Sequence, residues 1–260
     1  MKVNVISILW GNKYDEEDVN RLYSMIHRNT SHDIHFFLFS NNALPELRKE
    51  ITKLPEPTES SDIYSETLNY RKEAGLCDDN LGGLNGERVF FFDLDVLITG
   101  NLDEFFSYPQ DEDFYIINDW NTKGDHVGQA TCYSFVVGRL GFVKEGFEEK
   151  HTQIIDKFGT ASQEYLSSCI IDHFGKLNFW PEAWFRSFKL HCLPIWPLRK
   201  FITPRRPPIG TKVLAFHGHP DLRDAMDGRW APPGLKKSAK GWKKIYKQCR
   251  KTDWIKEYWQ

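Results

Sequence analysis

The run VFFFDLDVLI, from residue 89 to residue 98, constrains the fold more than any other part of the sequence. Its β-branched and aromatic residues predict a buried central strand. Asp93 and Asp95 interrupt the run, and in an extended strand both carboxylates would project from one face while Leu94 points to the other. Two ionised carboxylates in so apolar a setting repel each other and are costly to desolvate. A divalent cation at the open end of the strand would relieve both costs.

The same pair of acids has a simpler explanation. A strand can end in two carboxylates that are solvated or bound by backbone N–H groups, and an isolated DxD does not separate this reading from a metal site. The rest of the sequence has to decide between the two.

The first 40 residues predict a strand, a helix and a second strand. Residues 3–9 form a short apolar run that ends before Gly11, Asp15 is a candidate N-cap for the helix, and residues 34–39 repeat the strand pattern. Such a βαβ unit has parallel strands, and its ligands lie outside the carboxyl ends of those strands. The loop of residues 10–14 is therefore predicted to lie at a ligand-binding edge.

Later segments continue the alternation of strands and helices. Apolar runs at residues 114–117, 133–137 and 213–216 predict strands. Two helices are also expected: one carries Phe147, Ile154, Ile155 and Phe158, and the other opens near Ser162 and carries Leu166, Cys169 and Ile170. A chain of 260 residues is long enough for one large α/β domain. We expect that domain at residues 1–230, followed by a basic and aromatic tail at residues 231–260.

Composition narrows the compartment and the partners. With 34 Lys+Arg against 36 Asp+Glu, nothing in the charge balance calls for nucleic acid. The five cysteines are scattered and lack a CxxC spacing, which predicts free thiols in a reducing compartment. The apolar stretch at the start is too short to span a membrane and has no small-residue cleavage site, so no signal peptide or transmembrane segment is predicted. We expect a cytoplasmic location.

The text around the two acids, FFFDLDVLITGNLDEFF, resembles the DxD segment of GT-A fold glycosyltransferases. The resemblance is strongest to the retaining group similar to glycogenin and the bacterial lipooligosaccharide galactosyltransferases. It implies an α/β fold, a single GT-A type domain whose mostly parallel central sheet is flanked by helices. It also implies that Asp93 and Asp95 bind Mn²⁺ or Mg²⁺, which holds the diphosphate of a nucleotide-sugar donor, usually a uridine one.

A second match lies in VLAFHGHPDLRDAM, where His217 and Gly218 resemble the late histidine motif that returns to the metal in this family. The resemblance implies that His217 is the third protein ligand. His219 is the alternative candidate for this metal ligand. If His217 binds the metal, His219 is expected to bind the donor. A ligand set of carboxylates with one imidazole is more typical of an Mn²⁺ site than of a structural zinc site. Without the DxD, the two histidines would indicate only a surface turn.

Looser matches extend the donor site. The resemblance implies that the loop after the first strand contacts the donor through Trp10, Gly11 and Tyr14, with Tyr14 the best candidate to stack on the nucleobase. Leu94, between the two acids, is included in the donor site. Relatives place a cation before the DxD, near the donor phosphates or sugar, and either Arg71 or Lys72 fits that position. A solvated helix face is the alternative for this pair.

Two further residues are candidates for a catalytic role. Gln163 stands where relatives carry an Asp-Gln pair near the donor sugar, with Ser162 replacing the aspartate. Asp119 resembles another sugar-contacting position, although an acidic loop residue is often only exposed. The usual Asn-Ser appears here as Tyr133-Ser134, and no Lys-Pro-Trp follows His217. The donor sugar is therefore left open.

The tail joins many lysines to aromatic residues in LKKSAKGWKKIYKQCRKTDWIKEYWQ. It could form an interfacial helix that contacts anionic headgroups at the inner face of the membrane, near a lipid-linked acceptor. The alternative is an ordinary terminal helix that packs its aromatic residues on the domain.

Together these features predict a metal-dependent glycosyltransferase. It would transfer a hexose from a nucleotide-sugar to a hydroxyl of a glycan or glycolipid, with retention of configuration as the resemblance implies. One rival is a phosphatase of the haloacid dehalogenase type, in which an apolar strand also ends in DxD, although that motif lies near the N-terminus and is followed by Gly-Thr. The other is a carbohydrate-binding protein that keeps the fold without turnover.

Overall fold

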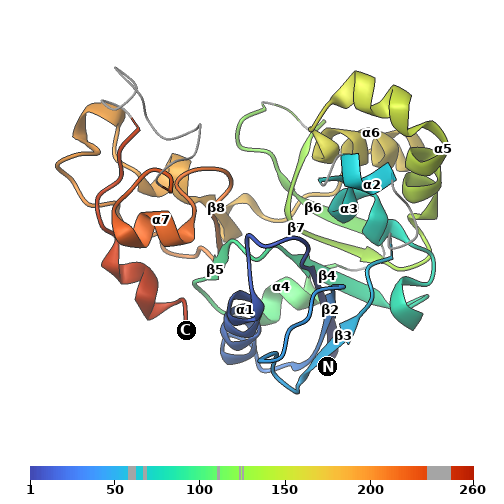
Figure 1. The fold of residues 1–260 in the computed structure, drawn as a ribbon, viewed down its shortest axis with the longest axis horizontal. Helices are drawn as coiled ribbons and strands as arrows, with labels where there is room; N and C mark the ends of the chain where they lie inside the picture. Colours follow the sequence, from blue (N-terminus) through green and yellow to red (C-terminus); the bar gives the residue numbers. More distant parts are fainter. Residues whose placement is uncertain (58–62, 67–68, 110–111, 123, 125, 233–246) are drawn as a thin grey trace. The chain divides into compact units, whose positions relative to one another are not determined.

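The computed structural model describes residues 1–57, 63–66, 69–109, 112–122, 124, 126–232 and 247–260 (Figure 1). The chain divides into two compact units whose segments alternate along the sequence. Unit 1 comprises Met1–Val19, His32–Asp93 and Glu104–Trp180, and unit 2 comprises Asn20–Ser31, Leu94–Asp103 and Pro181–Gln260. The predicted boundary at residue 230 stays a prediction.

Unit 1 is built on a six-stranded sheet with the order β3-β2-β1-β4-β7-β6. Its strands are β1 (Lys2–Ile8), β2 (Asp33–Phe39), β3 (Ile51–Leu54), β4 (Arg88–Phe92), β6 (Phe114–Asn118) and β7 (Gly128–Val136). Strands β3, β2, β1 and β4 pair in parallel, whereas β7 runs antiparallel to both β4 and β6. The α/β prediction is confirmed: the sheet is mixed because β7 alone runs opposite to the other strands, and five of its six strands are parallel, as the sequence predicts.

The predicted βαβ unit is present at the start of the chain. Strand β1 pairs with β2 in parallel from Lys2 opposite Asp33 to Ile8 opposite Phe39. Helix α1 (Glu16–Arg28) connects them, and the carboxylate of Asp15 accepts hydrogen bonds from the backbone N–H groups of Glu17 and Asp18. The N-cap prediction is therefore confirmed.

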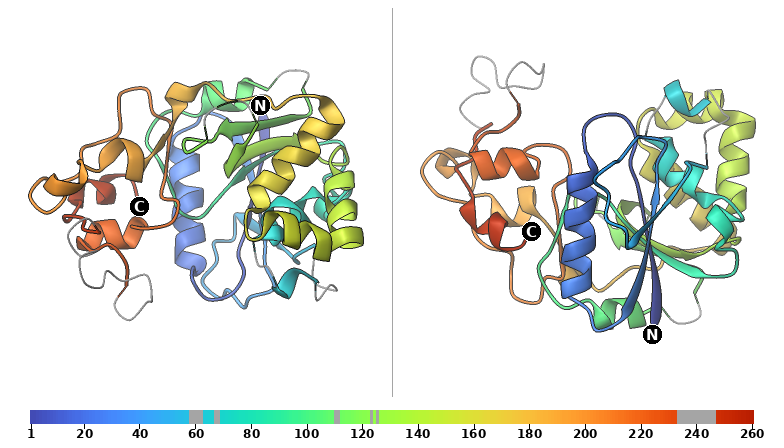
Figure 2. Two further views of the ribbon diagram at one scale, coloured as in Figure 1. Left: turned by 90° about the horizontal axis from the view of Figure 1, so that it is seen from above. Right: turned by 60° about the horizontal axis from the view of Figure 1, so that its bottom comes forward.

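Helices cover the sheet of unit 1. They are α2 (Ile63–Glu66), α3 (Tyr70–Glu73), α5 (Gly141–Phe158) and α6 (Ser162–Phe174), and α5 and α6 lie side by side in every view (Figures 1 and 2). Phe147 on α5 is fully buried and stacks on Tyr70 of α3, with ring centroids 4.3 Å apart. Helix α6 begins at Ser162, as the sequence predicts. The short helix α4 (Asp103–Ser107) contributes Phe105 and Phe106 to a second aromatic cluster around Phe90.

The apolar run of residues 89–98 is not one strand, so this prediction is wrong. Strand β4 ends at Phe92 in the large sheet, and β5 (Val96–Ile98) belongs to a separate three-stranded sheet with the order β5-β9-β8. That small sheet, with β8 (Phe185–Ser187) and β9 (Val213–Ala215), lies in unit 2. The chain bends between the two strands, at Leu94 and Asp95. Asp93 and Asp95 therefore do not project from one face of a continuous strand.

Unit 2 also includes α1 from Asn20 onward, and its other described elements are short. Among the described residues after β9, the longest element is helix α7 (Leu222–Asp227). The other short elements of unit 2 are single helical turns: η3 (Glu182–Trp184), η4 (Phe188–Cys192), η5 (Trp196–Leu198) and η7 (Asp253–Glu257). Unit 1 has two comparable turns, η1 (Gly75–Cys77) and η2 (Leu81–Gly83).

The tail is described only from residue 247 onward, so the prediction of a membrane-binding helix falls largely outside the described residues. Within the described part, Trp254 and Ile255 are buried in η7, and the indole N–H of Trp254 donates to the carbonyl of Pro204 at 2.9 Å. Trp254 therefore packs within unit 2, as the alternative interpretation of the tail predicts for its aromatic residues. No helix among the described residues is long and apolar enough to cross a membrane. All five cysteines are free thiols, as predicted.

A carboxylate at the turn before β4 carries a testable pH dependence. Asp78 accepts hydrogen bonds from the backbone N–H groups of Asn80 and Leu81, both at 3.0 Å, and pairs with Lys144. Burial raises the pKa of Asp78, but Lys144 and the two N–H donors outweigh burial and leave the pKa below its ordinary value. Ionised Asp78 therefore stabilises the folded state above pH about 4, the pKa of an unfolded aspartate, and this contribution is lost as the pH falls through the folded-state pKa.

We expect Asp78→Asn to lower the free energy of unfolding by about 1 kcal/mol at pH 7, because the pair is partly exposed. Urea unfolding of both proteins over a pH series would measure the difference, which is expected to shrink as the solution becomes acidic. A difference that stays constant with pH would contradict the assignment.

Candidate active site

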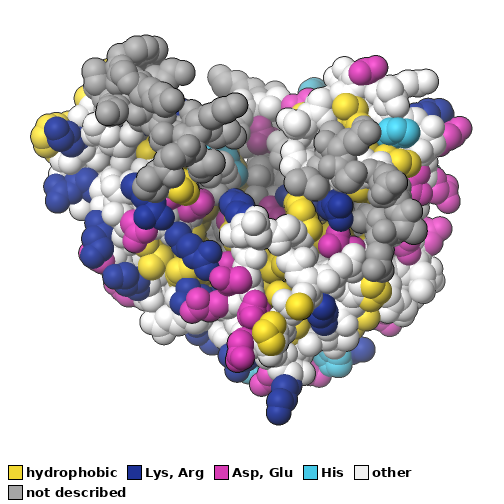
Figure 3. All heavy atoms as spheres, viewed as in Figure 1, with side chains coloured by type: hydrophobic (Ala, Val, Ile, Leu, Met, Phe, Trp, Pro, Cys, Tyr) yellow, Lys and Arg dark blue, Asp and Glu magenta, His cyan; other side chains and the backbone are white. Residues whose placement is uncertain are grey.

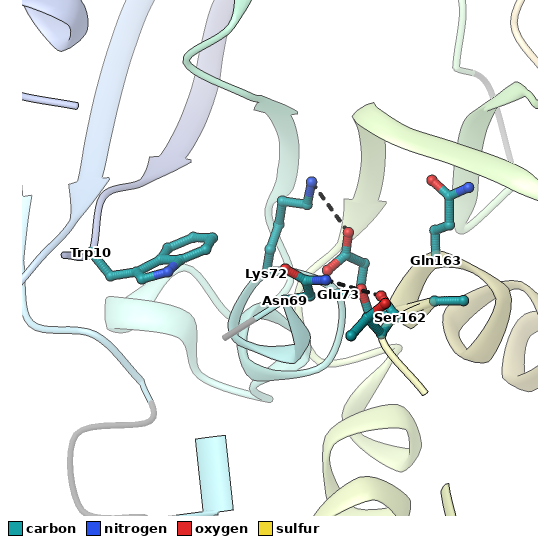
Figure 4. A pocket seen from close by; sticks show the side chains of 8 residues that line it. Trp10, Asn69, Lys72, Glu73, Ser162 and Gln163 are labelled. Atoms are coloured by element: carbon teal, nitrogen blue, oxygen red, sulfur yellow. Dashed lines mark hydrogen bonds and ion pairs between the residues drawn. The ribbon is translucent and has the colours of Figure 1, made fainter. Parts of the chain in front are cut away.

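A cavity of about 300 Å³ opens in unit 1 beside the carboxyl ends of the parallel strands. Side chains from three separate segments line it: Trp10, Asn69, Lys72, Glu73, Thr160, Ala161, Ser162 and Gln163. Figure 4 shows Trp10 on one side of this cavity, Gln163 on the other, and Lys72 with Glu73 between them. Trp10 and Lys72, which the sequence nominates for the donor site, therefore share one cavity with Gln163, a predicted catalytic residue.

Lys72 joins this cavity to the first acid of the DxD. Its Nζ lies 2.8 Å from Oδ2 of Asp93 and 3.2 Å from Oε1 of Glu73. The side chains are 15%, 24% and 5% exposed for Lys72, Asp93 and Glu73, so the network is largely shielded from water. One ammonium thus neutralises parts of two carboxylates, and the three side chains together keep a negative charge when all are ionised.

Glu73 is the most deeply buried member of the network. Burial raises the pKa of its carboxyl above the ordinary value, Lys72 opposes that rise, and the negative charge of Asp93 adds to it. The nearby Ser162 side chain favours the ionised form, whereas Oε2 has no hydrogen-bond partner among the described residues. A buried carboxylate oxygen without a partner is costly, and it can accept a hydrogen bond from a ligand.

Two contacts to neighbouring strands fix this network. The phenol of Tyr133 on β7 donates a hydrogen bond to the backbone carbonyl of Lys72 at 2.9 Å. Burial raises the pKa of Tyr133 well above its ordinary value, so the phenol remains a donor at neutral pH. The backbone N–H of Asp93 donates to the carbonyl of Thr131 at 2.9 Å, which keeps Asp93 attached to the edge of the large sheet beyond the end of β4.

In unit 2, a backbone contact brings Asp95 next to the late histidine segment. Strand β5 pairs with β9, and the N–H of Phe216 donates to the carbonyl of Asp95 at 3.0 Å. His217 follows directly, and its Nε2 lies 2.8 Å from the hydroxyl of Ser187. Two predicted ligands more than 120 residues apart in the sequence are therefore held on adjoining backbone of unit 2, whereas the third, Asp93, belongs to unit 1.

The second histidine belongs to a different group of side chains. His219, Asp221 and Asp224 can bring one ligand atom each within 4.8 Å of the others, and this is the one such His, Cys, Asp or Glu group within the described part of the chain. Nδ1 of His219 lies 3.5 Å from Oδ2 of the buried Asp224. Asp224 is also paired through Oδ1 with Arg229 at 2.7 Å. The carboxylate thus already has a counter-charge from the protein.

The loop after β1 contains Gly11 and Tyr14, two of the residues predicted for the donor site. Gly11 adopts a positive φ of 65°, and a Cβ there would meet no atom within 4 Å. The carbonyl of Gly11 accepts a hydrogen bond from the side chain of Asn42 at 2.7 Å. Tyr14 lies in the same loop, where Lys13 contacts both its hydroxyl and its ring. Tyr14 is not among the residues that line the cavity.

The other candidates have structural partners. Arg71 pairs with the buried Glu56 at 2.6 Å and does not line the cavity, so the cationic position there belongs to Lys72. Asp119 accepts hydrogen bonds from the backbone N–H groups of Asn121 and Thr122, at 3.0 and 2.7 Å, and closes a turn after β6. Leu94 is buried in unit 2.

Glu73 and Asn69 line the cavity but are not among the residues that the sequence nominates. Glu73 follows directly after Lys72, so only their adjacency could have signalled it. Asn69 donates from its side chain to the carbonyl of Thr160 at 2.9 Å and ties the start of α3 to the segment before α6. Asn69 and Thr160 are 91 residues apart in the sequence, and no local sequence pattern predicts a contact between them.

No protein-family model and no curated protein matches this chain. Solved structures do match it. The galactosyltransferase LgtC, crystallised with donor and acceptor sugar analogs, has 10% sequence identity and a TM-score of 0.55, with 85% of this chain and 89% of LgtC covered. Mouse xyloside xylosyltransferase 1 has 10% identity and a TM-score of 0.51, with 84% of this chain and 98% of that chain covered. The glycosyltransferase GlyE of Streptococcus pneumoniae TIGR4 has 11% identity and a TM-score of 0.51, with 95% of this chain and 59% of GlyE covered.

The chain has the GT-A fold. This finding confirms the resemblance drawn from the DxD segment at the level of fold. At such low identity the likeness shows the fold alone and not the activity, the donor or the metal of these enzymes.

Proposed function

We propose that the chain is a metal-dependent glycosyltransferase. It transfers a hexose from a nucleotide-sugar, a UDP-sugar in the first instance, to a hydroxyl of a glycan or glycolipid. The observation that carries the proposal is the cavity lined by Trp10, Lys72, Glu73 and Gln163, with Lys72 in contact with Asp93 of the DxD, in a chain with the GT-A fold.

The chemistry of the proposed ligands fits a hard divalent cation. Asp93 and Asp95 supply carboxylate oxygens and His217 an imidazole nitrogen, a set that suits Mn²⁺ or Mg²⁺. Asp93 lies at the end of β4 against an ammonium group, so its carboxylate is already in an environment that binds positive charge. Bound there, the ion would act as a Lewis acid toward the diphosphate of the donor.

The side chains of the cavity have complementary tasks. Lys72 neutralises negative charge that develops on the departing nucleoside diphosphate, and Glu73 keeps the ammonium group oriented. Asn69, Ser162 and Gln163 offer the amide and hydroxyl groups that bind sugar hydroxyls, and the indole of Trp10 offers an apolar face to the ring. We propose retention of configuration, which NMR of the anomeric proton in the product would test.

Calorimetric titration with UDP, with and without Mn²⁺, tests the donor site on the wild type and on Asp95→Ala. We expect UDP binding that depends on Mn²⁺ and that Asp95→Ala weakens at least about tenfold. Loss of a residue that only hydrogen-bonds to a metal ligand already lowers metal affinity by about that factor. A panel of UDP-sugars then ranks the donor. Comparing His217→Ala with His219→Ala identifies the histidine on which the metal dependence rests.

Asp33→Ala is the matched control, since Asp33 is a strongly exposed aspartate of unit 1. Its affinity for UDP is expected to equal that of the wild type. Binding of UDP that is independent of metal, or no binding at all, would contradict the proposal and direct the search to other nucleotides and to release of phosphate from an aryl phosphate.

A further inference from the structure

Exposed apolar side chains are concentrated in one short segment of unit 2. Of the nine large hydrophobic side chains that are exposed in the described residues, seven lie between residues 190 and 209: Leu190, Ile195, Trp196, Leu198, Phe201, Ile202 and Ile209. We call residues 190–209 the exposed apolar loop. Single exposed hydrophobic residues are ordinary on protein surfaces, but a cluster of this kind marks an interaction site.

The backbone of this loop is held firmly while its side chains face outward. The N–H of Arg205 donates to the carbonyl of Cys192 at 3.0 Å and closes the base of the loop. Arg250 and Trp254 donate to the carbonyls of Phe201 and Pro204, both at 2.9 Å. Trp196 and Phe201 nevertheless remain 53% and 66% exposed. The fold therefore presents these side chains to the outside at a cost in hydration that an apolar partner would offset.

The charge of the same region is one-sided. Residues 188–220 contain no Asp or Glu, although the whole chain has a net charge of -2. The loop and the residue before it carry five basic side chains: Lys189, Arg199, Lys200, Arg205 and Arg206. Arg206 pairs with Glu257 and Arg199 lies over the ring of Trp230, whereas Lys200 and Arg205 are exposed. Figure 3 shows Lys and Arg side chains gathered over the surface of unit 2.

We propose that the exposed apolar loop binds the surface of an anionic lipid bilayer. Trp196, Phe201 and the neighbouring aliphatic side chains enter the boundary between headgroups and acyl chains, while Lys200 and Arg205 lie against the anionic headgroups. Such an attachment holds the enzyme at a membrane without a spanning helix. It is carried by a segment distinct from the tail of residues 231–260.

Charge and composition favour a bilayer over a protein partner. A second copy of the chain would bring the same positive charge against the loop in a symmetric dimer, which is repulsive. Protein interfaces are also depleted in lysine at their centres, whereas exposed apolar side chains in a segment that also carries Lys and Arg are characteristic of membrane-surface segments.

Flotation of the full chain with phosphatidylcholine vesicles, with and without phosphatidylglycerol, tests the proposal. We expect binding that is stronger on the anionic vesicles. The double variant Trp196→Ser/Phe201→Ser is expected to lower the partition coefficient at least about tenfold, since two aromatic side chains no longer leave water. Lys200→Gln/Arg205→Gln is expected to lower the partition coefficient about 25-fold on the anionic vesicles alone, at about fivefold for each basic residue.

Tyr108→Ser, which removes an exposed aromatic side chain from unit 1, is the matched control and is expected to bind as the wild type does. Circular dichroism and UDP affinity of the variants check that folding and the donor site are intact. The proposal is overturned if the wild type binds neither vesicle, or if both double variants bind as the wild type does. A concentration-dependent dimer that the aromatic variant abolishes, without vesicle binding, would instead make the loop an interface between copies.

Discussion

Lys72→Met is expected to lower the rate of sugar transfer by about 10²- to 10³-fold, the effect of removing one group that stabilises charge in a transition state. The ammonium of Lys72 lies 2.8 Å from Asp93 and 3.2 Å from Glu73, inside the cavity proposed for the donor. Methionine keeps most of the volume and removes the charge. Both carboxylates then lose their shared counter-charge, and the leaving group loses a cation that is shielded from water and therefore strong. Steady-state kinetics with a UDP-sugar and an acceptor would measure the loss.

Two further variants separate a role of Lys72 in the reaction from a role in folding. Lys176→Met makes the same substitution in an ion pair of the same 2.8 Å length, but both partners of that pair are exposed. It is expected to leave the rate within about twofold, because exposed pairs contribute little. Lys72→Arg is expected to recover part of the rate, since it restores the charge with different geometry. A Lys72→Met protein with an unchanged kcat would remove Lys72 from the mechanism.

The early part of the fold could be predicted because its signals are local. The capping carboxylate of Asp15, the helical spacing after it and the β-branched runs on either side all act over a few residues, and the structure has β1, α1 and β2 where those signals place them. The single strand predicted for residues 89–98 is wrong because every apolar residue in that run favours a buried strand equally. Only long-range pairing, of Phe92 with Cys132 and of Val96 with Ala215, separates β4 from β5.

In the candidate site, too, residues in recognisable local motifs could be predicted, and residues placed by long-range contacts could not. Trp10, Lys72 and Gln163 could be nominated because each stands in a segment that resembles a known motif. Glu73 could not, because α3 is a single turn in which two adjacent residues both line the cavity, and helical periodicity separates neighbours by about 100°. Glu73 of α3 lines the same cavity as Ser162 of α6, and only the tertiary fold brings these two elements together.

Phe147→Ala is expected to lower the free energy of unfolding by about 3–5 kcal/mol, the usual cost of removing a buried phenylalanine ring. Phe147 has no exposed surface, and its ring centroid lies 4.3 Å from that of Tyr70, 5.1 Å from that of Tyr64 and 6.0 Å from that of Tyr165. The cavity left by alanine would be lined by three stiff aromatic rings, which cannot easily collapse into it.

Calorimetry is expected to show a Tm lower by on the order of 10 °C for Phe147→Ala. Phe201→Ala removes the same group from a side chain that is 66% exposed and is expected to change the stability by less than about 0.5 kcal/mol. Because Tyr70 begins the turn that carries Lys72 and Glu73, loosening this aromatic cluster is also expected to weaken UDP binding at temperatures below the transition. Equal loss of stability in the two variants would show that α5 does not pack on α3 as described, and would remove the support on which the position of Lys72 depends.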